Sequence, residues 1–246
     1  MPTRKTSPVD GRILAIDIGG TGLKAALVDR RGKMLTERLR VKTPHPSPPK
    51  TVLAELGKLV RAFEIDSSVI GVSVGFPGVV RDGRIRTAPN LGTERWKGFD
   101  LAGALRRRWK KPVRVLNDAD MQGLGAIRGK GIEMVVTLGT GFGSSIFDHG
   151  RLAPHLEISH HPFRKNQTYE EQLGNAALET IGKKKWNRRV RLAIDTLRVL
   201  TNFDRLYIGG GNAKHLKLEH DPDIEIVSND CGVRGGAALW RDGSAR

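Results

Sequence analysis

The 246-residue sequence contains one cysteine, Cys231. A single cysteine cannot form a disulfide within the chain, and it cannot supply a cysteine-rich zinc site. We therefore predict a protein without zinc that is suited to the reducing cytoplasm. Long apolar runs are also missing, since none approaches the roughly 20 residues that a membrane-spanning helix needs. This absence predicts no membrane association.

Two further signals are absent. The basic segment MPTRKTSPVDGR leads directly into a strand-like segment, without the apolar region or cleavage site of a signal peptide. No GKS or GKT follows a glycine turn at Walker spacing, which argues against a P-loop. We therefore expect a short N-terminal tail in front of the fold, and phosphate binding by another kind of turn.

Acidic residues are scarce relative to basic ones. The chain has 42 Lys and Arg residues against 26 Asp and Glu residues, which gives a formal net charge of +16. Such an excess predicts a polyanionic partner, for which nucleic acid, inorganic polyphosphate and phosphorylated metabolites are the candidates. The alternative is a basic protein whose charge serves solubility alone.

One pattern occurs twice: an apolar run, a glycine turn, a second apolar run, an Asp and a Gly-basic turn. Adding 119 to the numbers of four residues of the first copy gives four identical residues of the second, Gly20, Thr21, Gly22 and Asp29 becoming Gly139, Thr140, Gly141 and Asp148. We interpret this match as an internal duplication. It predicts an α/β fold of two duplicated lobes with a central cleft, residues 12–116 forming the first and 117–246 the second.

The periodicity of the remaining segments predicts the elements of these lobes. An antiparallel meander is expected from Arg12 through Val41. A buried strand is expected at 69–74, further strands at 113–118 and 205–211, and helices at 51–63, 101–109 with Asp100 as N-cap, 169–181 and 186–200. A terminal helix near 233–240 is a candidate to pack back on the first lobe.

Three glycine clusters are candidates to hold phosphate, because backbone N–H groups approach phosphate oxygens closely only where side chains are absent. A glycine pair in a hairpin also serves as a plain turn. The third cluster ends a strand and is expected to begin a helix, whose dipole would favour an anion. The candidate residues are Asp17, Gly19, Gly20, Thr21, Gly22 and Lys24 in the first cluster, Thr140 and Gly141 in the second, and Gly209, Gly210, Gly211 and Asn212 in the third.

The pair Asn117-Asp118 is the best catalytic candidate. A strand that ends in polar residues before a helix aims them at the carboxyl edge of a sheet, where ligands bind. A phosphoryl acceptor needs a carboxylate to take its proton, which we assign to Asp118. Asp120 is a candidate to cap the following helix instead.

The histidine-rich segment 155–161 admits two interpretations. A zinc site would need Glu157 or a distant residue as a further ligand. Glu157 and His160 equally suit hydrogen bonds to neighbouring sugar hydroxyls. The basic run Lys183, Lys184, Lys185, Arg188 and Arg189 also has two interpretations, as a solvated helix face or as a landing surface for polyphosphate or nucleic acid.

These motifs together resemble the ROK family of sugar kinases, of the actin-like (ribonuclease H-like) superfamily, over almost the whole chain. The motifs are DIGGTGLK, GFPGVV, APNL, LNDAD, TLGTGFGS, HLEISH and LYIGGGNAK. The resemblance implies a base at Asp118, a magnesium-side acid at Asp17, phosphate contacts at Thr21 and Thr140, and sugar ligands at Asn90, Asn117, Glu157 and His160. It also implies a further sugar-binding glutamate, Glu170 with Glu171 as the alternative, and a homodimer.

Two departures qualify the resemblance. FRKNQTYEEQLG stands where most members have a zinc-binding cysteine cluster, so His160 loses its usual zinc role. Glu157-Ile158-Ser159-His160 stands where Glu-Leu-Gly-His is usual, which puts the sugar preference in doubt. The segment GKKKWNRRV resembles the polyphosphate glucokinase branch. Because the first strand is expected near Arg12, we expect no helix-turn-helix before it.

We therefore predict a Mg²⁺-dependent kinase that phosphorylates the 6-hydroxyl of glucose, with mannose as a candidate second hexose, from polyphosphate, ATP or both. A strictly ATP-dependent kinase for another hexose is the alternative. A sugar sensor that binds nucleic acid and has lost catalysis is an alternative of another class. Retention of Asp118, Asp17 and both glycine turns argues against it, so nucleic acid is not the expected partner.

Overall fold

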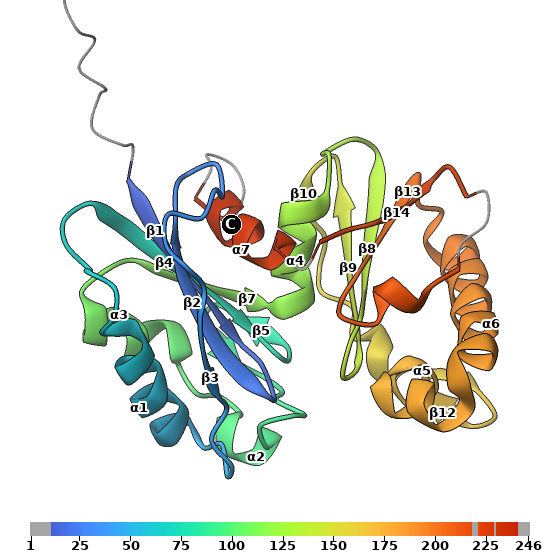
Figure 1. Cartoon of the computed structure of the whole chain (residues 1–246), viewed down its shortest axis with the longest axis horizontal. Coiled ribbons are helices and arrows are strands. Elements are labelled where there is room, and N and C mark those ends of the chain that lie inside the picture. Colours follow the sequence, from blue (N-terminus) through green and yellow to red (C-terminus); the bar gives the residue numbers. More distant parts are fainter. Residues whose placement is uncertain (1–10, 218–220, 229, 241–246) are drawn as a thin grey trace, which may run out of the picture. The chain divides into compact units, whose positions relative to one another are not determined.

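The computed structural model describes residues 11–217, 221–228 and 230–240. The chain divides into two units (Figure 1). The described residues up to Met121 and those from Gly232 onward form the first unit, and Gln122–Cys231 form the second. The division falls inside helix α4 (Asp118–Ala126). The lobe limits of 12–116 and 117–246 stay a prediction.

The first unit is built on a five-stranded sheet. Its strand order is β3-β2-β1-β4-β7, in which β1, β2 and β3 are antiparallel neighbours and β1, β4 and β7 run parallel. The predicted meander is therefore confirmed. The strands are β1 (Arg12–Ile18), β2 (Gly22–Val28), β3 (Leu39–Lys42), β4 (Val69–Phe76) and β7 (Val113–Asn117).

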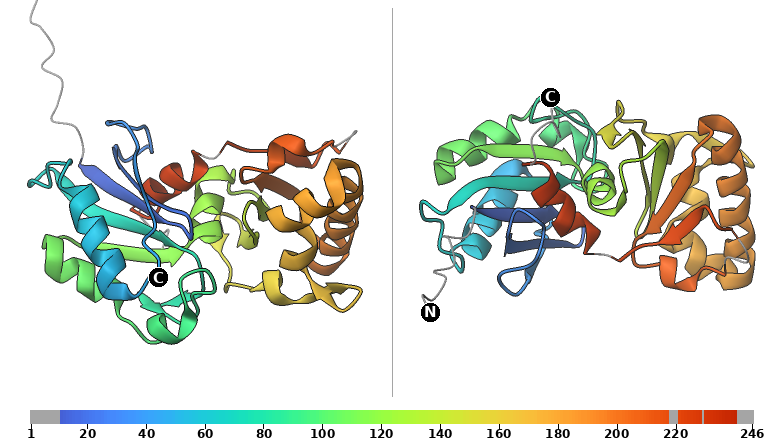
Figure 2. Two further views of the ribbon diagram at one scale, coloured as in Figure 1. Left: turned by 60° about the horizontal axis from the view of Figure 1, so that its bottom comes forward. Right: turned by 90° about the horizontal axis from the view of Figure 1, so that it is seen from above.

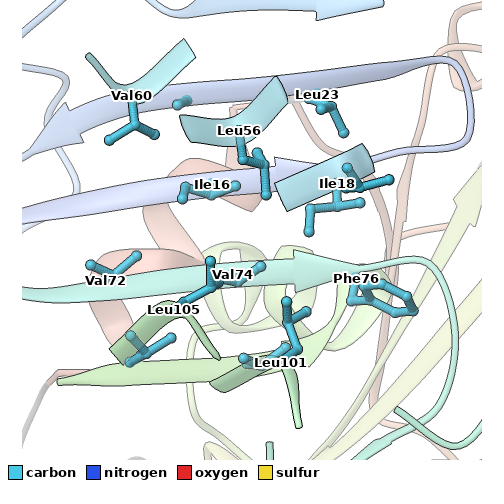
Figure 3. Close-up of a cluster of buried hydrophobic side chains, with 14 of the residues drawn as sticks. Ile16, Ile18, Leu23, Leu56, Val60, Val72, Val74, Phe76, Leu101 and Leu105 are labelled. Carbon is cyan, nitrogen blue, oxygen red and sulfur yellow. The ribbon is translucent and has the colours of Figure 1, made fainter. Parts of the chain in front are cut away.

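Helices cover both faces of this sheet. Apolar residues of α1 (Pro49–Val60) and α3 (Leu101–Trp109) pack against alternate residues of β1 and β4 in one core (Figure 3). The other residues of β1, Ile13 and Ala15, pack against Ala237 of α7 (Cys231–Ala238). The Trp240 indole N–H donates to Oγ of Ser73 at 2.8 Å. The predicted return of the last helix to the N-terminal sheet is thus observed within this unit.

Two small elements connect β4 to α3. A hairpin of β5 (Val80–Arg81) and β6 (Arg84–Ile85) is followed by α2 (Thr93–Trp96). The Asp100 carboxylate accepts from the Gly103 N–H at 2.8 Å, which confirms it as the N-cap of α3.

The second unit repeats the plan with a sheet of order β10-β9-β8-β13-β14. Its first two strands by sequence, β8 and β9, are again an antiparallel hairpin, and β13 again joins the first of them in parallel. The strands are β8 (Ile132–Leu138), β9 (Phe142–Asp148), β10 (Arg151–Leu152), β13 (Arg205–Gly209) and β14 (Ile224–Ile226). The predicted α/β class with a duplicated plan is confirmed at this level.

Helices α5 (Tyr169–Leu173) and α6 (Asn175–Thr201) cover one face of this sheet through a common core (Figure 2). Of the predicted helices at 169–181 and 186–200, the end at Ile181 is confirmed, because the non-helical Gly182 (φ 75°, ψ 159°) interrupts α6 there. The end of α5 before Gly174 was missed, and the start at Trp186 is too late, because α6 is helical on both sides of Gly182. Between β10 and α5 lie the 3₁₀ helix η1 (Ile158–His160) and a hairpin of β11 (Pro162–Arg164) and β12 (Gln167–Thr168).

In the part of the chain that the structure describes, no helix is both long enough and apolar enough to cross a bilayer.

Candidate active site

The first glycine turn joins β1 to β2. Four residues, Gly19 to Gly22, lie between the paired residues Ile18 and Leu23, and the Gly19 N–H donates to the Gly22 carbonyl at 3.0 Å. The Thr43 hydroxyl donates to the Gly19 carbonyl at 2.5 Å from the next strand. The predicted phosphate turn is thus a closed hairpin fixed from one side, and Thr21 at its tip is exposed.

A row of charged side chains crosses the sheet beside this turn. Asp17 pairs with Lys24, and Lys24 pairs with Arg40 on β3. Residues directly opposite each other share a face of the sheet, so these three side chains are neighbours. The Lys24 ammonium lies 2.7 Å from the Asp17 carboxylate, and both side chains are partly exposed. The row carries an acid and two cations next to glycine N–H groups.

Sequence reasoning missed Arg40. Its strand, β3, was expected, but nothing in LRVK marks one cation as part of a site. In the structure a Cβ at Gly22 would lie 2.7 Å from Nε of Arg40, so the guanidinium covers the turn at this glycine. Asn90, a predicted sugar ligand, covers the turn at Gly20, where a Cβ would lie 3.0 Å from the Asn90 Cβ.

Asn117 caps helix α4, which begins at Asp118. Its Oδ1 accepts from the N–H groups of Ala119 at 2.8 Å and Asp120 at 3.2 Å, while its amide donates to the Gly78 carbonyl at 3.2 Å. The capping role that the sequence offered to Asp120 therefore belongs to Asn117, and Asp120 is buried. One amide N–H of Asn117 is left over from these bonds, so its predicted role toward sugar stays a prediction.

The predicted base, Asp118, is exposed at the start of α4. Its Oδ1 accepts from the Ala119 N–H at 2.9 Å, which orients the carboxylate. Asp17 pairs with Gly75 of β4, and a Cβ at Gly75 would lie 3.7 Å from the Asp118 Cα. The small residue lets the start of α4 sit directly on the sheet beside Asp17. The first unit therefore brings Asp17, Asn117 and Asp118 together at one edge of its parallel strands.

The second glycine turn joins β8 to β9, and it is one residue shorter than the first. Gly139, Thr140 and Gly141 lie between the paired residues Leu138 and Phe142, and the Gly139 N–H donates to the Gly141 carbonyl at 3.1 Å. The match at a constant difference of 119 is therefore gapless only from the turn onward. The strands before the two turns differ by 120, so the position of Asp17 corresponds to Thr137.

Two polar segments hold this turn from behind. The Asn212 N–H donates to the Leu138 carbonyl at 2.9 Å, and its side-chain amide donates to the Gly139 carbonyl at 3.1 Å. The Asn175 N–H, at the start of α6, donates to the Gly139 and Thr140 carbonyls at 3.0 and 3.2 Å. Sequence reasoning missed Asn175. Thr140 is exposed, so the turn presents it outward.

The third glycine cluster lies against the second. Gly210 has φ of 89°, and a Cβ there would lie 2.2 Å from the Leu138 carbonyl oxygen, so only glycine fits. The α-helix expected after Asn212 is wrong, because a three-residue 3₁₀ helix, η2 (Ala213–His215), follows. A dipole argument for anion binding by this cluster therefore fails. What the structure gives the cluster is support of the Gly139–Gly141 turn.

Glu170 also contacts the second turn. Its Oε2 accepts from the Ser159 hydroxyl at 2.7 Å, and a Cβ at Gly141 would lie 2.7 Å from the same oxygen. Glu171 instead completes a capping box with Thr168, whose hydrogen bonds lower the pKa of the Glu171 carboxyl. Glu171 thus serves the helix, which favours Glu170 as the glutamate that contacts sugar.

Glu157 directly precedes η1 in the same region, and His160 is the last residue of η1. Glu157 precedes the 3₁₀ helix and lies 3.5 Å from Nε2 of His155, and His160 is exposed. Across residues 11–217, 221–228 and 230–240, no three His, Cys, Asp or Glu side chains form a group that could hold a metal. The expectation of a zinc-free protein stays a prediction.

The cations of the basic run divide into a group of four and Lys183. Residues three or four apart share a face of a helix, so Lys184 and Lys185 lie with Arg188 and Arg189, whereas Lys183 lies with Asn187. Trp186 between them is fully buried, and its indole donates to the Leu173 carbonyl at 2.9 Å. The Arg189 guanidinium packs toward Gln172, and burial followed by repulsion from Arg164 lowers its pKa.

With this geometry in view, comparison with known proteins decides the family. The model of the ROK family matches residues 13–162. The chain belongs to the ROK family. This confirms the resemblance that the motifs predicted.

Relatives within the family have a defined activity. The polyphosphate glucokinase of Mycobacterium leprae (strain TN) is 32% identical over 92% of this chain and 74% of its own length. The polyphosphate glucokinase of Mycobacterium tuberculosis (strain H37Rv) is 31% identical over 90% of this chain and 88% of its own length.

Solved structures show the same fold. The inorganic polyphosphate/ATP-glucomannokinase of Arthrobacter sp. strain KM has a TM-score of 0.81 at 30% identity, covering 92% of this chain and 97% of its own. A ROK glucokinase of Streptomyces griseus, solved with glucose and AMPPNP, has a TM-score of 0.73 at 21% identity, covering 95% and 100%. The predicted actin-like sugar-kinase fold is confirmed.

Proposed function

We propose that this ROK protein is a glucokinase that transfers a phosphoryl group from inorganic polyphosphate or ATP to the 6-hydroxyl of glucose, with mannose as a candidate second substrate. The observation that carries the proposal is the exposed carboxylate of Asp118, which stands beside Asp17 at the edge of the first sheet. The polyphosphate glucokinases that share about a third of its residues over almost the whole chain support the choice of substrates.

Asp118 is the general base of this proposal. Its carboxylate accepts the proton of the 6-hydroxyl while that oxygen forms a bond to the terminal phosphorus of the donor. The bond from this phosphorus to the bridging oxygen breaks, and the electron pair stays on the leaving phosphate. The products are glucose 6-phosphate and either ADP or a polyphosphate shortened by one phosphate. The Asn117 cap and the Ala119 N–H keep the carboxylate in place.

The residues fit a magnesium ion that is held mainly by the donor. Mg²⁺ usually binds one or two carboxylates together with substrate phosphates and water. Asp17 supplies one carboxylate next to the first glycine turn, and Lys24 occupies one of its oxygens. When bound, the ion would neutralise charge on the donor phosphates. Lys24 orients the Asp17 carboxylate and adds a positive charge near the same turn.

The remaining predicted contacts divide between donor and sugar. For the donor, we propose the N–H groups and hydroxyls of the two turns, Gly19 to Gly22 and Gly139 to Gly141, with Arg40 as an additional cation. For the sugar, we propose Asn90, Asn117, Glu157, His160 and Glu170. A homodimer and a cytoplasmic location accompany the proposal as predictions.

The test is to incubate the purified full chain with glucose and Mg²⁺, supply either polyphosphate or ATP, and measure glucose 6-phosphate. Turnover with polyphosphate, lost when Mg²⁺ is chelated, is the expected result. Turnover with ATP alone on another hexose would replace the proposal with the strictly ATP-dependent alternative. No turnover with any hexose and either donor would overturn it.

A further inference from the structure

Two basic segments of the second unit meet at one side chain, Asn187 of α6. Its amide nitrogen donates to the carbonyls of Lys183 at 2.9 Å and His215 at 3.0 Å. Its oxygen accepts from the Lys217 N–H at 2.7 Å. One neutral side chain therefore fastens the segment that leaves η2 to the helix at Lys183, and both segments carry lysines.

The two hydrogen bonds from the Asn187 amide place the backbone of Lys183 beside that of His215, the residue that follows Lys214. Partial burial lowers the pKa of the His215 imidazole, and the ammonium groups of Lys183 and then Lys214 lower it further. Both lysines are exposed. Bringing two cations together costs free energy that an anion between them would recover.

Other cations of the same helix are neutralised by ion pairs with carboxylates. Arg191 forms a two-pronged ion pair with Asp221, and Arg198 pairs with Asp223. Among the described residues, neither Lys183 nor Lys214 is in an ion pair with a carboxylate. The part of α6 around Lys183 therefore keeps its positive charge, whereas Arg191 and Arg198 further along the helix are neutralised.

The lysine pair is connected to the second glycine turn through Asn212. Asn212 holds that turn by its N–H and its amide, and η2 with Lys214 begins at the next residue. A phosphate chain long enough to extend from Thr140 to the far side of Asn212 would therefore reach these cations. ATP has too few phosphates to extend that far, whereas a chain of inorganic polyphosphate is long enough.

We infer that Lys183 and Lys214 form a binding track for the distal phosphates of inorganic polyphosphate, and that Asn187 positions the two lysines. The inference rests on the proposed function, and it identifies the residues of the basic region that bind the polyphosphate donor. Nucleic acid fits less well, since single strands bind through cations interleaved with aromatic side chains on which bases stack. Trp186, the aromatic residue of the basic run, is fully buried.

The test compares two charge-matched double variants, K183Q/K214Q and K184Q/R188Q. Each removes two positive charges from the same region, so the long-range field changes equally. We measure binding of long-chain polyphosphate and of tripolyphosphate at several salt concentrations, together with KM values for both donors. For K183Q/K214Q we expect long-chain affinity to fall about five- to twentyfold and its log-log salt slope to flatten by about one unit. K184Q/R188Q should change affinity less than threefold.

Asn187→Ala supplies a variant without a charge change. It should weaken long-chain polyphosphate binding while leaving KM for ATP and the thermal melting of the protein close to wild type. If Asn187 had only a structural role, the substitution would lower the melting temperature and weaken the use of both donors. That result would contradict a positioning role.

The outcomes separate the track from the proposed function. If the wild type turns over polyphosphate but both double variants bind it equally, the track is wrong and the kinase assignment stands. If the wild type has no polyphosphate turnover, the proposed donor fails, and the binding measurement still decides the track. A single-stranded oligonucleotide that binds more tightly than polyphosphate and responds to the same two lysines would overturn the choice of ligand.

Discussion

The glycine hairpin of the first unit carries an ion pair, whereas the hairpin of the second unit has Thr137 and Gly143 at the same positions. Asp17 and Lys24 lie next to the closing pair Ile18–Leu23, as Thr137 and Gly143 lie next to Leu138–Phe142. The backbone plan is repeated, but the acid and the cation occur once. Of the two hairpins, the first alone therefore has a charged pair beside its turn.

The two turns also differ in the groups that hold them in place. Side chains, Arg40 and Asn90, cover the first turn, and a threonine hydroxyl fixes its carbonyl. The second turn is held by backbone and amide donors from Asn175 and Asn212, with Gly210 pressed against Leu138. A turn held by backbone contacts tolerates little change, because the backbone cannot move aside as a flexible side chain can. The first turn is thus specialised in charge and the second in rigidity.

The largest expected effect tests whether catalysis belongs to the acid beside the first hairpin. Asp118→Asn keeps the shape of the side chain and its bond from Ala119, but an amide cannot accept the proton. We expect kcat to fall about 10²- to 10⁴-fold with little change in glucose KM. The exposed Asp148→Asn in the second unit is the matched control and should keep wild-type kcat. A variant at Asp118 that retains more than a tenth of kcat would show that another group is the base.

The second prediction compares the equivalent positions of the two hairpins. Asp17→Asn removes the carboxylate and leaves Lys24 without its partner, so we expect activity to fall about 10- to 100-fold and the Mg²⁺ requirement to rise. Thr137→Val, one residue before the second turn, should change activity less than threefold. Activity is measured over a Mg²⁺ titration with each donor. Equal losses at the two positions would contradict the division of charge between the hairpins.

The third prediction tests the rigidity of the second turn at two adjacent glycines. Gly210→Ala forces a side chain into a positive φ and against the Leu138 carbonyl, so we expect unfolding free energy to drop by about 1–3 kcal/mol. Gly211→Ala is the control, because a Cβ at Gly211 meets nothing within 4 Å. Denaturant unfolding of both variants measures the difference. If Gly210→Ala and Gly211→Ala were equally stable, the backbone around the second turn would have to move aside as easily as a flexible side chain.

The sequence predicted the sheets of both units because buried strands, glycine turns and caps are local signals. The meander, the strands β4 and β7 and the Asp100 cap all follow from patterns within a few residues of each element. The resemblance to ROK kinases was predictable for the same reason, since its motifs are short and contiguous. The break at Gly174 was not predicted, because good helix formers lie on both sides of this glycine, whereas the helix end at Ile181 was.

The arrangement around the turns could not be predicted. Nothing in the sequence places Arg40 over Gly22 or Asn175 behind Gly139, because those contacts join segments that are distant along the chain. The one-residue difference between the turns was also hidden, since the identical GTG triplets gave a convincing gapless match. The separation of Lys183 from the other four cations of the basic run needed only helical spacing, and it was missed because the run was considered as a single block.

The smallest expected effect concerns Asp66 of the first unit, and the test is whether a change in its pKa leaves activity unchanged. Hydrogen bonds from Ser68 and Arg12 to Asp66 lower the pKa of its carboxyl from 3.8 to about 2. A carboxyl whose pKa is depressed on folding favours the folded state when it is ionised. Its contribution is therefore complete above pH 3.8 and is lost as the pH falls toward 2. Ser68→Ala removes the first of these partners and should return the Asp66 pKa toward 3.8, as measured by NMR titration. Because the site is exposed and distant in sequence from both turns, activity at pH 7 should not change. A loss of activity in Ser68→Ala would contradict this prediction. It would mean that the first glycine turn depends on the region around Asp66 as well as on the Asp17–Lys24 ion pair and the side chains that cover the turn.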